Sequence, residues 1–260
     1  MTEHERELTG GNASGRVVRV GSTVRKPWTP GSASVQAYVA ELRARGVDAP
    51  EPLGRDERGR QILEYVDGPL AQDRVPLGDT ELRRVGAMVR AIHDASEGLP
   101  IPDALTAGML LPTEGADLLC HNDLAPWNLV LGERWVFIDW DGAGPSTRLW
   151  DLAYAAQAFA MLVGGEPVET AARRLRAFVG GYDADLRLRE ALPAAMAKRT
   201  AAMFELLRSS SETGTAPWAE MYRSGHGEHW RAAAEYVAEN EAAWARAVTE
   251  APAAHGTRRR

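Results

Sequence analysis

Residues 118–143, LLCHNDLAPWNLVLGERWVFIDWDGA, combine side chains that can move protons or bind metals with strongly apolar neighbours. One histidine, three aspartates and two asparagines lie in or beside the apolar runs LLC, LVL and WVFI. Burying an ionised carboxylate without a partner is costly. The segment therefore forms either a surface hairpin whose charges lie in water or a site whose carboxylates face a cation.

The spacing of these residues favours the cation site. The sequence HNDLAPWN from His121 fits H-x-D-L-x-x-x-N, in which the aspartate orients or deprotonates an acceptor hydroxyl and the asparagine binds magnesium. Asp139 follows the predicted strand WVFI and is placed as a second magnesium ligand, and magnesium prefers such oxygen ligands. Two flanking strands would bring Asp123, Asn128 and Asp139 to one end of a hairpin. We therefore expect Asp123 to be catalytic and Asn128 and Asp139 to hold Mg²⁺.

The alternative is a solvated hairpin in which Asp123 and Asn128 serve only as turn formers. An isolated H-x-D is a weak signal for catalysis. Its combination with the downstream sequence I-D-W-D, at a workable distance and inside apolar strands, is much more specific. We therefore interpret the segment as a site for a metal and a phosphate.

Strands and one helix are expected in the first third of the chain. Arg16–Val20 and Thr23–Lys26 are rich in β-forming residues and are joined by a Gly-Ser pair, which is typical of a hairpin. Over residues 32–46 apolar residues recur at helical spacing, and a glycine follows the last of them as a C-cap. A hairpin around Asp56–Gly59 then leads into a strand at Gln61–Val66.

From Asp79 onward the sequence is mostly helical. The first helix is amphipathic, with Asp79 or Thr80 as its N-cap. Further helical patterns cover residues 147–162, 167–182, 188–210 and 229–248. We therefore expect an α+β protein with a small, sheet-rich N-terminal lobe over residues 1–66 and a mostly helical C-terminal lobe over residues 67–260. Its last residues, 251–260, are expected to be a disordered tail.

The sequence CHNDLAPWNLVL…FIDWDGAGPSTRLWDLA closely resembles the aminoglycoside phosphotransferase family, whose members are relatives of the protein kinases. The similarity follows nearly the whole chain in order and is strongest over residues 118–153. It implies a protein-kinase-like fold with two lobes, and transfer of the γ-phosphoryl group of ATP or GTP to a hydroxyl. By this resemblance Asp123 is the catalytic base, and Asn128 and Asp139 hold Mg²⁺.

Two further roles follow from the same resemblance. His121 would brace the loop that carries Asp123. Asp151, in the sequence LWDLA, would be a structural cap beneath that loop. From the residues alone, Asp151 could equally be an ordinary carboxylate at a helix N-terminus.

The resemblance implies a nucleotide site in the N-terminal lobe. Gly10–Val17 fit G-x-G-x-x-G-x-V except that Asn12 replaces the middle glycine, and asparagine tolerates positive φ better than most residues. By the resemblance, Gly11, Ser14 and Gly15 of this loop contact the nucleotide. A flexible N-terminal linker would have a similar composition, so the assignment depends on the position of the loop directly before a hairpin.

A lysine that contacts the phosphates is expected on the strand TVRKP. Val24 and Lys26 share one face of this strand because side chains alternate, so Lys26 is the predicted contact and Arg25 the alternative. Relatives commonly pair this lysine with a glutamate near the start of the next helix. This chain has Ser34-Val35-Gln36 there and offers Glu41 only more than one turn later. The usual ion pair is therefore in question.

The sequence ILEYVDG resembles the linker between the two lobes. Backbone groups of Glu64, Tyr65 and Val66 are expected to contact the purine. Their side chains do not discriminate ATP from GTP.

The composition is that of an ordinary globular chain of 260 residues, 45% hydrophobic and 25% charged. A net charge of −6 disfavours a nucleic-acid partner and is compatible with a cationic substrate. The charged N-terminus lacks the apolar core of a signal peptide, and no apolar run reaches membrane-spanning length. The single cysteine, Cys120, is expected to be a buried thiol. We expect a cytoplasmic monomer or homodimer that binds neither nucleic acid nor membranes.

The acceptor is a hydroxyl-bearing small molecule that the sequence does not identify. In this family the C-terminal helices supply the acceptor pocket, and here acidic and aromatic side chains could hold a polyamine sugar. Ordinary surface statistics instead assign such aromatics to the core and such glutamates to a solvated face. The candidates are Glu205, Glu220, Glu228, Glu235, Trp218, Tyr222, Trp230, Tyr236 and Trp244. The family acts on aminoglycosides, other antibiotics, choline, sugars and amino alcohols, so antibiotic resistance is an inference by analogy.

Two other classes of protein were weighed. A catalytically weak kinase relative that acts as a binding or immunity protein is suggested by Asn12 and by the missing helix glutamate. The complete set of Asp123, Asn128 and Asp139 opposes it. A Rossmann-type nucleotide-binding protein is excluded because no strand precedes a proper G-x-G-x-x-G within a βαβ unit.

Overall fold

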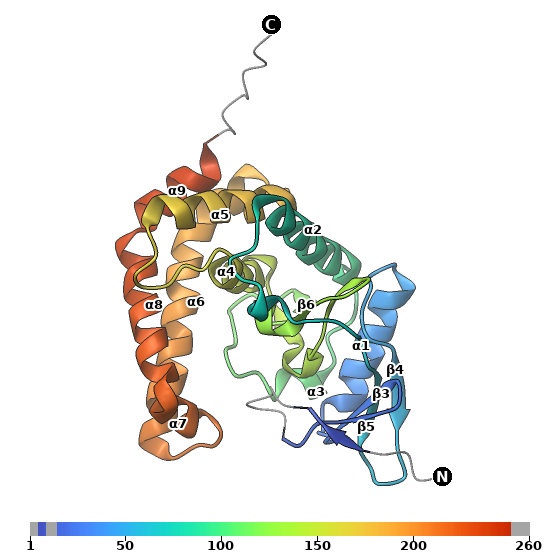
Figure 1. Cartoon of the computed structure of the whole chain (residues 1–260). Helices are drawn as coiled ribbons and strands as arrows, with labels where there is room; N and C mark the ends of the chain where they lie inside the picture. The colour runs from blue at the N-terminus through green and yellow to red at the C-terminus, as the bar shows by residue number, and fades with distance from the viewer. Residues whose placement is uncertain (1–4, 9–14, 251–260) are drawn as a thin grey trace, which may run out of the picture.

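The computed structural model describes residues 5–8 and 15–250, and its sheet-rich part comes first in the chain (Figure 1). Five antiparallel strands form one sheet in the order β1-β2-β3-β5-β4. Helix α1 (Ser32–Ala44) connects β3 to β4 and packs against β4. The strands are β1 (Arg6–Glu7), β2 (Val18–Val20), β3 (Thr23–Lys26), β4 (Pro52–Arg55) and β5 (Gln61–Glu64).

The hairpin predicted between β2 and β3 is confirmed. Val20 pairs with Thr23 across a tight turn in which Gly21 has a φ of +59°, a conformation that glycine adopts without steric cost. Strand β3 also pairs with β5, which places Lys26 opposite Gln61. Strand β5 ends at Glu64, two residues earlier than the sequence predicts.

Helix α1 buries the face that its apolar spacing predicts, including Val35 and Leu42. The hydroxyl of Tyr38 on this face donates to the carbonyl oxygen of Leu119 at 2.9 Å and lies 2.7 Å from Ser96 Oγ. Because both partners belong to later elements, α1 is anchored to the part of the chain that carries the polar segment.

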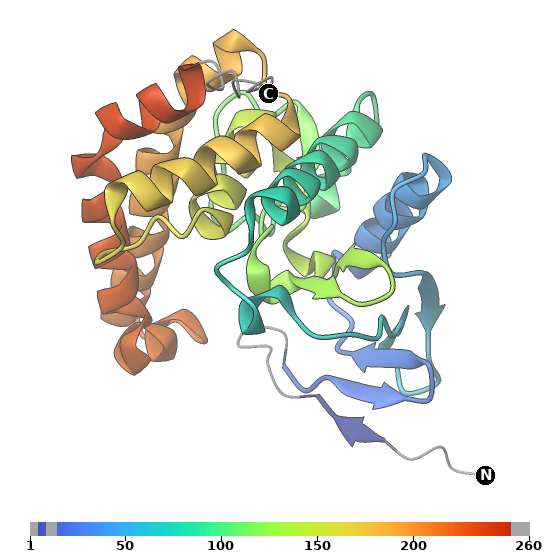
Figure 2. The same ribbon diagram turned by 45° about the horizontal axis from the view of Figure 1, so that its top comes forward.

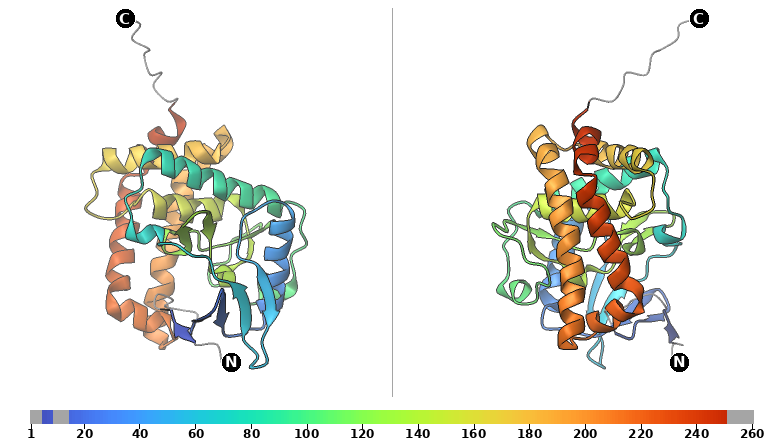
Figure 3. Two further views of the ribbon diagram at one scale, coloured as in Figure 1. Left: turned by 45° about the vertical axis from the view of Figure 1, so that its right-hand side comes forward. Right: turned by 90° about the vertical axis from the view of Figure 1, so that its left-hand side faces the viewer.

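The remainder of the described chain is mostly helical. Figures 1 and 3 show α6 and α8 side by side along one flank of the molecule, with the blue sheet on the opposite flank and the green strands between them. The helices are α2 (Asp79–Ser96), α3 (Asp103–Thr106), α4 (Arg148–Phe159), α5 (Val168–Tyr182), α6 (Leu186–Thr213), α7 (Trp218–Met221), α8 (Gly227–Glu239) and α9 (Glu241–Thr249). Over residues 5–8 and 15–250, no helix has both the length and the apolar character needed to cross a membrane.

Four short strands form two small antiparallel sheets, β6 with β9 and β7 with β8. They are β6 (Leu118–Cys120), β7 (Leu129–Leu131), β8 (Trp135–Phe137) and β9 (Gly144–Ser146). Single helical turns lie at η1 (Ala71–Asp73), η2 (Pro126–Asn128) and η3 (Trp140–Gly142), and a π-helical turn η4 (Tyr222–His226) joins α7 to α8. The lobe boundary predicted between residues 66 and 67 falls between β5 and α2 and stays a prediction.

Besides the end of β5, two predictions about helix boundaries were wrong. The N-cap of α2 is Gly78 rather than Asp79 or Thr80, because the Glu81 carboxylate turns back to accept the backbone N–H of Gly78 at 2.9 Å. The helical pattern over residues 229–248 is divided between α8 and α9 at Asn240, whose ψ of 17° lies outside the helical region.

Helices α2 and α5 lie in close contact (Figure 2), and two glycines permit this approach. A Cβ atom on Gly86 would overlap the carbonyl oxygen of Phe178, and a Cβ atom on Gly181 would overlap main-chain atoms of Arg83. Main-chain atoms cannot move aside as the end of a flexible side chain can. The distance between the two helices therefore depends on glycine at both positions.

Gly181→Ala is expected to lower the midpoint of thermal unfolding by several degrees, since overpacking a well-packed contact costs about 1–3 kcal/mol. The matched control is Gly180→Ala on the same helix, where the added Cβ would meet only the side-chain Nη1 of Arg83, at 3.6 Å. Alanine favours a helix over glycine by about 1 kcal/mol, so this control should be neutral or stabilising. Equal midpoints for the two variants would contradict the close crossing.

Candidate active site

The loop His121–Asn128 joins β6 to β7, and β8 leads through Ile138 to Asp139. Strands β7 and β8 pair antiparallel, and the backbone N–H of Ile138 donates to the carbonyl oxygen of Asn128 at 2.8 Å. Asn128 and Asp139 therefore lie at the same end of the β7–β8 hairpin. This is the arrangement that the sequence predicts.

Asp123 is half-buried, and both of its carboxylate oxygens accept hydrogen bonds. The side-chain amide of Asn128 donates to Oδ2 at 2.7 Å and to the carbonyl oxygen of Asp123 at 3.0 Å. The hydroxyl of Tyr154 on α4 donates to Oδ1 at 2.8 Å. Burial and the neighbouring Asp123 carboxylate raise the pKa of Tyr154 well above its ordinary value, so this hydroxyl stays protonated and remains a donor.

His121 lies beneath the loop and is fully buried. Its Nδ1 accepts the backbone N–H of Asp123 at 3.3 Å, and its Nε2 donates to the carbonyl oxygen of Ile138 at 3.1 Å. The ring also packs 4.4 Å from the ring of Trp140, measured between centroids. His121 thus connects the loop to the strand that leads to Asp139, which is the bracing position that the family resemblance implies.

Asp151, in the first turn of α4, holds the loop from the other side. Its Oδ1 accepts the backbone N–H of Asn122 at 2.9 Å. Asn122 has a φ of +65°, a left-handed conformation that a non-glycine residue adopts at an energetic cost. The fully buried carboxylate therefore stabilises an unfavourable backbone conformation next to Asp123, and Asp151 is more than an ordinary carboxylate at a helix N-terminus.

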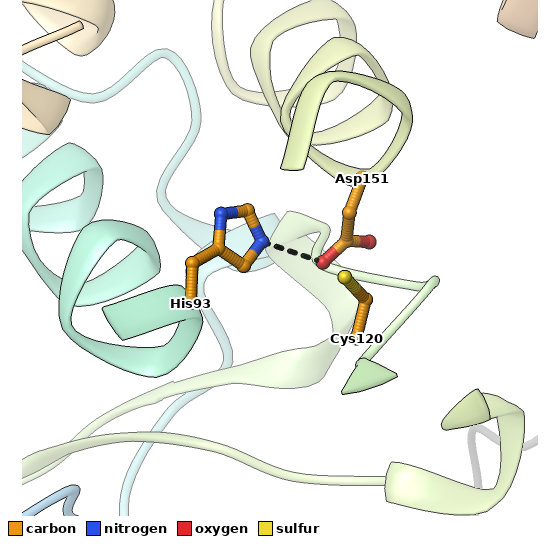
Figure 4. Close-up of side chains that lie close together, drawn as sticks. All are labelled: His93, Cys120 and Asp151. Carbon is orange, nitrogen blue, oxygen red and sulfur yellow. Dashed lines mark hydrogen bonds and ion pairs between the residues drawn. The ribbon is translucent and has the colours of Figure 1, made fainter. Parts of the chain in front are cut away.

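A second buried residue fixes Asp151 in turn. Figure 4 shows His93 of α2 directed at the Asp151 carboxylate, with Nε2 3.0 Å from Oδ2. The other ring nitrogen, Nδ1, lies 2.9 Å from the hydroxyl of Tyr182. Cys120 lies beside the pair, and burial raises the pKa of its thiol.

The side chains of His93, Cys120 and Asp151 approach within 4.8 Å of one another and could in principle hold a metal. Both nitrogens of His93 and both oxygens of Asp151 already have hydrogen-bonding partners. We therefore interpret this cluster as a brace for the loop rather than as a metal site.

Lys26 is buried at the end of β3, and its ammonium lies between two carboxylates. Nζ is 3.0 Å from Oδ1 of Asp139 and 2.8 Å from Oδ1 of Asp141. Burial disfavours the charged ammonium, but the two carboxylates outweigh this effect and raise the pKa of Lys26. Arg25 faces the other side of the strand, 3.6 Å from Asp56. As the residue to contact the phosphates, the geometry therefore favours Lys26, one of only two lysines in the chain, over the alternative Arg25.

Helix α1, all of which the structure describes, contributes no carboxylate to Lys26. The side-chain amide of Gln36 donates to the carbonyl oxygen of Gly54 at 3.2 Å, and Glu41 is exposed. Asp141, two residues after Asp139, makes the ion pair instead. The usual ion pair with the helix, which the sequence left in question, is therefore not formed among the described residues, and Lys26 pairs instead with the two carboxylates that follow β8.

Of the glycine-rich loop, the structure describes the part that begins at Gly15. Gly11 and Ser14 lie outside the described residues, while Gly15 is described and has a φ of +68°. Its Cα lies next to Pro27, since a Cβ atom there would meet the proline ring at 3.3 Å. The nucleotide contacts expected of this loop stay predictions.

The linker residues have different backbone environments. The backbone N–H of Glu64 donates to the carbonyl oxygen of Glu51, and that of Tyr65 to the carbonyl oxygen of Ser22, both at 2.9 Å. The side chain of Val66 is buried against Val130 and Val136 and forms a small apolar cluster beside the β7–β8 hairpin. An apolar floor of this kind suits a flat purine ring, but the purine contact of these three residues stays a prediction.

The residues at the end of the hairpin suit a magnesium ion. The amide nitrogen of Asn128 is used within the loop, which leaves its carbonyl oxygen as the atom to bind a cation. The carboxylate of Asp139 already contacts the cationic ammonium of Lys26, so positive charge is favoured there. Oxygen atoms from an amide and a carboxylate, completed by phosphate oxygens and water, are the ligands that Mg²⁺ prefers.

The acidic residues proposed for an acceptor pocket are largely neutralised. Glu205 forms an ion pair with Arg208, and Glu228 and Glu235 both form ion pairs with Arg231. All three glutamates face solvent, including Glu205, whose neighbours in the sequence are apolar. Three of the four candidate glutamates are therefore held by arginines rather than left available to a polycationic sugar.

The aromatic residues of the C-terminal helices form two groups. Tyr236 and Trp244 belong to the main core, as surface statistics predict. Trp230 instead stacks on Tyr154, with ring centroids 6.1 Å apart, and Trp218 and Tyr222 pack around the same cluster. Because Tyr154 is hydrogen-bonded to Asp123, this second group lies next to the polar loop.

Three residues at the site were not found from the sequence. Asp141 lies within the sequence that carries the family resemblance, but no role was assigned to it. Tyr154 lies three residues after Asp151, so helical spacing already places both on one face of α4 and could have revealed it. Arg199 of α6 lies against this face, with its guanidinium carbon 4.3 Å from the centre of the Tyr154 ring. One arginine among 30 basic residues gives no signal.

Comparison with known families agrees with this geometry. Residues 103–190, which include the His121–Asn128 loop, Asp139 and Asp151, match the model described as the phosphotransferase enzyme family. No curated protein sequence matches the chain.

Solved structures that resemble this chain share its fold at sequence identities below 20%. A choline/ethanolamine kinase family protein from Mesorhizobium loti is 18% identical, with 94% of this chain and 93% of that chain covered and a TM-score of 0.62. Amicoumacin kinase in complex with AMP-PNP, Ca²⁺ and Ami is 15% identical, with 93% and 89% covered and a TM-score of 0.65. The gentamicin–APH(2″)-IIa complex is 12% identical, with 90% and 93% covered and a TM-score of 0.56.

These structures confirm the α+β, protein-kinase-like fold with two lobes that the sequence predicts. Residues 103–190 thus match the phosphotransferase enzyme family, to which the resemblance in the sequence also pointed.

Proposed function

We propose that the protein transfers the γ-phosphoryl group of ATP or GTP to a hydroxyl of a small molecule, with Mg²⁺ as cofactor. The observation that carries this proposal is the convergence of Asp123, Asn128 and Asp139 at one end of the β7–β8 hairpin, beside the buried ammonium of Lys26. These are the side chains that phosphoryl transfer needs, since catalysis of this reaction consists mainly of positioning and charge stabilisation.

Each residue has a separate part in the proposed reaction. The Asp123 carboxylate orients the acceptor hydroxyl and takes its proton as the new bond to phosphorus forms and the bond to the nucleoside diphosphate breaks. Asn128 and Asp139 hold Mg²⁺, which when bound neutralises charge on the phosphate oxygens. Lys26 extends its ammonium to the phosphates, with Gly11, Ser14 and Gly15 around them and Glu64, Tyr65 and Val66 at the purine.

For the acceptor we propose a hydroxylated antibiotic or amino alcohol of low charge. Similar folds occur in an amicoumacin kinase, in a gentamicin complex of APH(2″)-IIa and in a choline/ethanolamine kinase family protein. The aromatic group around Tyr154 offers an apolar surface, and the candidate glutamates Glu205, Glu228 and Glu235 are paired with arginines. This favours a substrate with an apolar face over a polycation. A cytoplasmic location and a monomeric or homodimeric state stay predictions from the sequence.

The rival hypothesis is a kinase-like binding or immunity protein without strong catalysis. Two features suggested it: Asn12, which lies outside the described residues, and the missing helix glutamate, which would leave Lys26 without its usual partner. The ion pair between Lys26 and Asp141 removes the second support.

The proposal is tested first without an acceptor, by following thermal unfolding with and without magnesium-ATP. A ligand at about a hundred times its dissociation constant adds roughly 2.7 kcal/mol to stability, which shifts the midpoint by several degrees. We expect this shift in the native protein and its loss in Asp139→Ala, which lacks a proposed metal ligand.

The matched control is Glu133→Ala, which removes an exposed carboxylate at the opposite end of the same hairpin. It should keep the full shift. A well-folded native protein that shows no shift with millimolar ATP or GTP would contradict the proposed nucleotide site. A shift justifies a screen of hydroxylated antibiotics and amino alcohols for phosphate acceptance.

A further inference from the structure

Arg199, near the middle of α6, is a buried arginine with few hydrogen-bonding partners. Its side chain is nearly inaccessible, at 5% exposure. Among the residues that the structure describes, none accepts a hydrogen bond from its Nε or Nη1, and Nη2 makes one long contact of 3.4 Å with the carbonyl oxygen of Asn122. A guanidinium has five N–H donors, so most of them are unsatisfied.

Aromatic rings, rather than carboxylates, surround this guanidinium. Its central carbon lies 4.3 Å from the centre of the Tyr154 ring and 5.7 Å from that of Trp150. No carboxylate within residues 5–8 and 15–250 forms an ion pair with it. Burial lowers the pKa of Arg199, and the negative charges of Asp151 and Asp123 only partly offset this effect. Cation–π contact is therefore its main compensation.

Such an arrangement is costly for folding. A buried charge without an ion pair loses its hydration and gains little in return. An apolar side chain of similar length would fill the same space without unsatisfied donors. A contribution to stability therefore does not account for an arginine at this position. An effect of its charge on a neighbouring group accounts for it.

That neighbour is Tyr154, which connects Arg199 to Asp123. The Tyr154 ring is 4% exposed and is held between the guanidinium and the stacked ring of Trp230. Its hydroxyl donates to Oδ1 of Asp123 at 2.8 Å, while Asn128 holds Oδ2. Arg199 also contacts the carbonyl oxygen of Asn122, the residue directly before Asp123. Tyr154 and Arg199 together thus contact both the side chain of Asp123 and the backbone next to it.

We propose that Tyr154 and Arg199 form a positioning pair that fixes the orientation of the Asp123 carboxylate for proton acceptance. This inference depends on the role of Asp123 in the proposed function. Tyr154 supplies the hydrogen bond that restricts rotation of the carboxylate. The positive charge of Arg199 stabilises the carboxylate anion when the nucleotide and acceptor exclude water from it, because electrostatic interactions strengthen as water leaves.

The test compares the melting midpoint and the turnover of single-site variants. Turnover is measured as ADP release from magnesium-ATP, with water or an acceptor from the screen. Arg199→Met removes the charge but keeps much of the volume. We expect it to raise the melting midpoint by a few degrees. It should also lower kcat by roughly 10–100-fold at unchanged KM for ATP, the loss that is usual when a residue that orients a functional side chain is removed. Arg199→Lys, which retains the charge, should recover part of kcat.

Two more variants, Tyr154→Phe and a control at a neighbouring lysine, complete the comparison. Tyr154→Phe keeps the ring and should lower kcat to a similar extent. When Arg199→Met is added to Tyr154→Phe, the further loss of kcat should be smaller than the loss that Arg199→Met causes in the native protein. The matched control is Lys198→Met, which removes an exposed positive charge from the position directly before Arg199 in α6. It should change neither kcat nor the melting midpoint appreciably. A lower midpoint for Arg199→Met, or unchanged turnover in it or in Tyr154→Phe, overturns the positioning pair.

Absence of any ATP turnover in the native protein would contradict the proposed function without deciding on the pair. The pair is then decided by a thermal double-mutant cycle between Arg199→Met and Asp123→Asn. If Arg199 stabilises the Asp123 anion, Arg199→Met should raise the midpoint more in the Asp123→Asn background, where that attraction is already lost. Additive midpoints overturn the inference.

Discussion

Asp123→Ala is expected to reduce phosphoryl transfer by roughly 10²–10⁴-fold, the usual contribution of a positioned general base. The side chain is half-buried, with Asn128 and Tyr154 fixing its two oxygens, and no other carboxylate of the described residues occupies its place in the loop. The metal ligands and Lys26 are retained in this variant. Nucleotide binding, measured by the shift in melting midpoint with magnesium-ATP, should therefore remain close to that of the native protein.

The control for this variant is Asp117→Ala, which removes an exposed carboxylate just before β6. It should leave turnover unchanged. Retained turnover in Asp123→Ala would show that another residue is the base. If a toxic acceptor is found, survival of cells that produce the protein is a second measurement. An enzyme with Asp123 mutated no longer protects the cells from the toxin, whereas a protein that only sequesters the toxin still does.

Asp151→Ala is expected to destabilise the fold by about 3–5 kcal/mol, as for other buried pairs that lose one member. It leaves His93 without its partner at Nε2 and leaves the backbone N–H of Asn122 without an acceptor in an unfavourable conformation. Urea unfolding followed by circular dichroism measures the change. Because the loop with Asp123 loses its anchor, turnover of the folded fraction should also fall.

Glu190→Ala is the control for this experiment, since Glu190 is an exposed carboxylate on α6. It should change stability by no more than about 0.5 kcal/mol. A change of similar size in Asp151→Ala would mean that the buried cluster of His93, Cys120 and Asp151 contributes little to the loop, and the interpretation of that cluster as a brace would be wrong.

Local patterns were sufficient for the central part of the site. Asn128 and Asp139 flank one hairpin, whose strand pairing brings them together, and Asp123 lies in the loop that leads into it. The alternation of side chains along β3 likewise distinguished Lys26 from Arg25, because neighbouring residues of a strand face opposite sides. The helical spacing of α1 predicted its buried face for the same kind of reason.

Boundaries were less predictable because they depend on a few competing hydrogen bonds. Gly78 became the N-cap of α2 because Glu81 reached back to its backbone, although Asp79 has the better intrinsic preference. The break at Asn240 separates two segments that each have a helical pattern, so the pattern alone does not reveal it.

Long-range packing supplied the partners that no local pattern could reveal. Lys26 and Asp139 are 113 residues apart, and Arg199 and Asn122 are 77 apart. The sequence shows that the helix glutamate is missing, but only the approach of β3 to the segment after β8 shows that Asp141 replaces it. The folding of α6 against α4 brings the charge of Arg199 to Tyr154. Side-chain spacing is set by the nearby backbone, whereas these contacts depend on how separate elements pack.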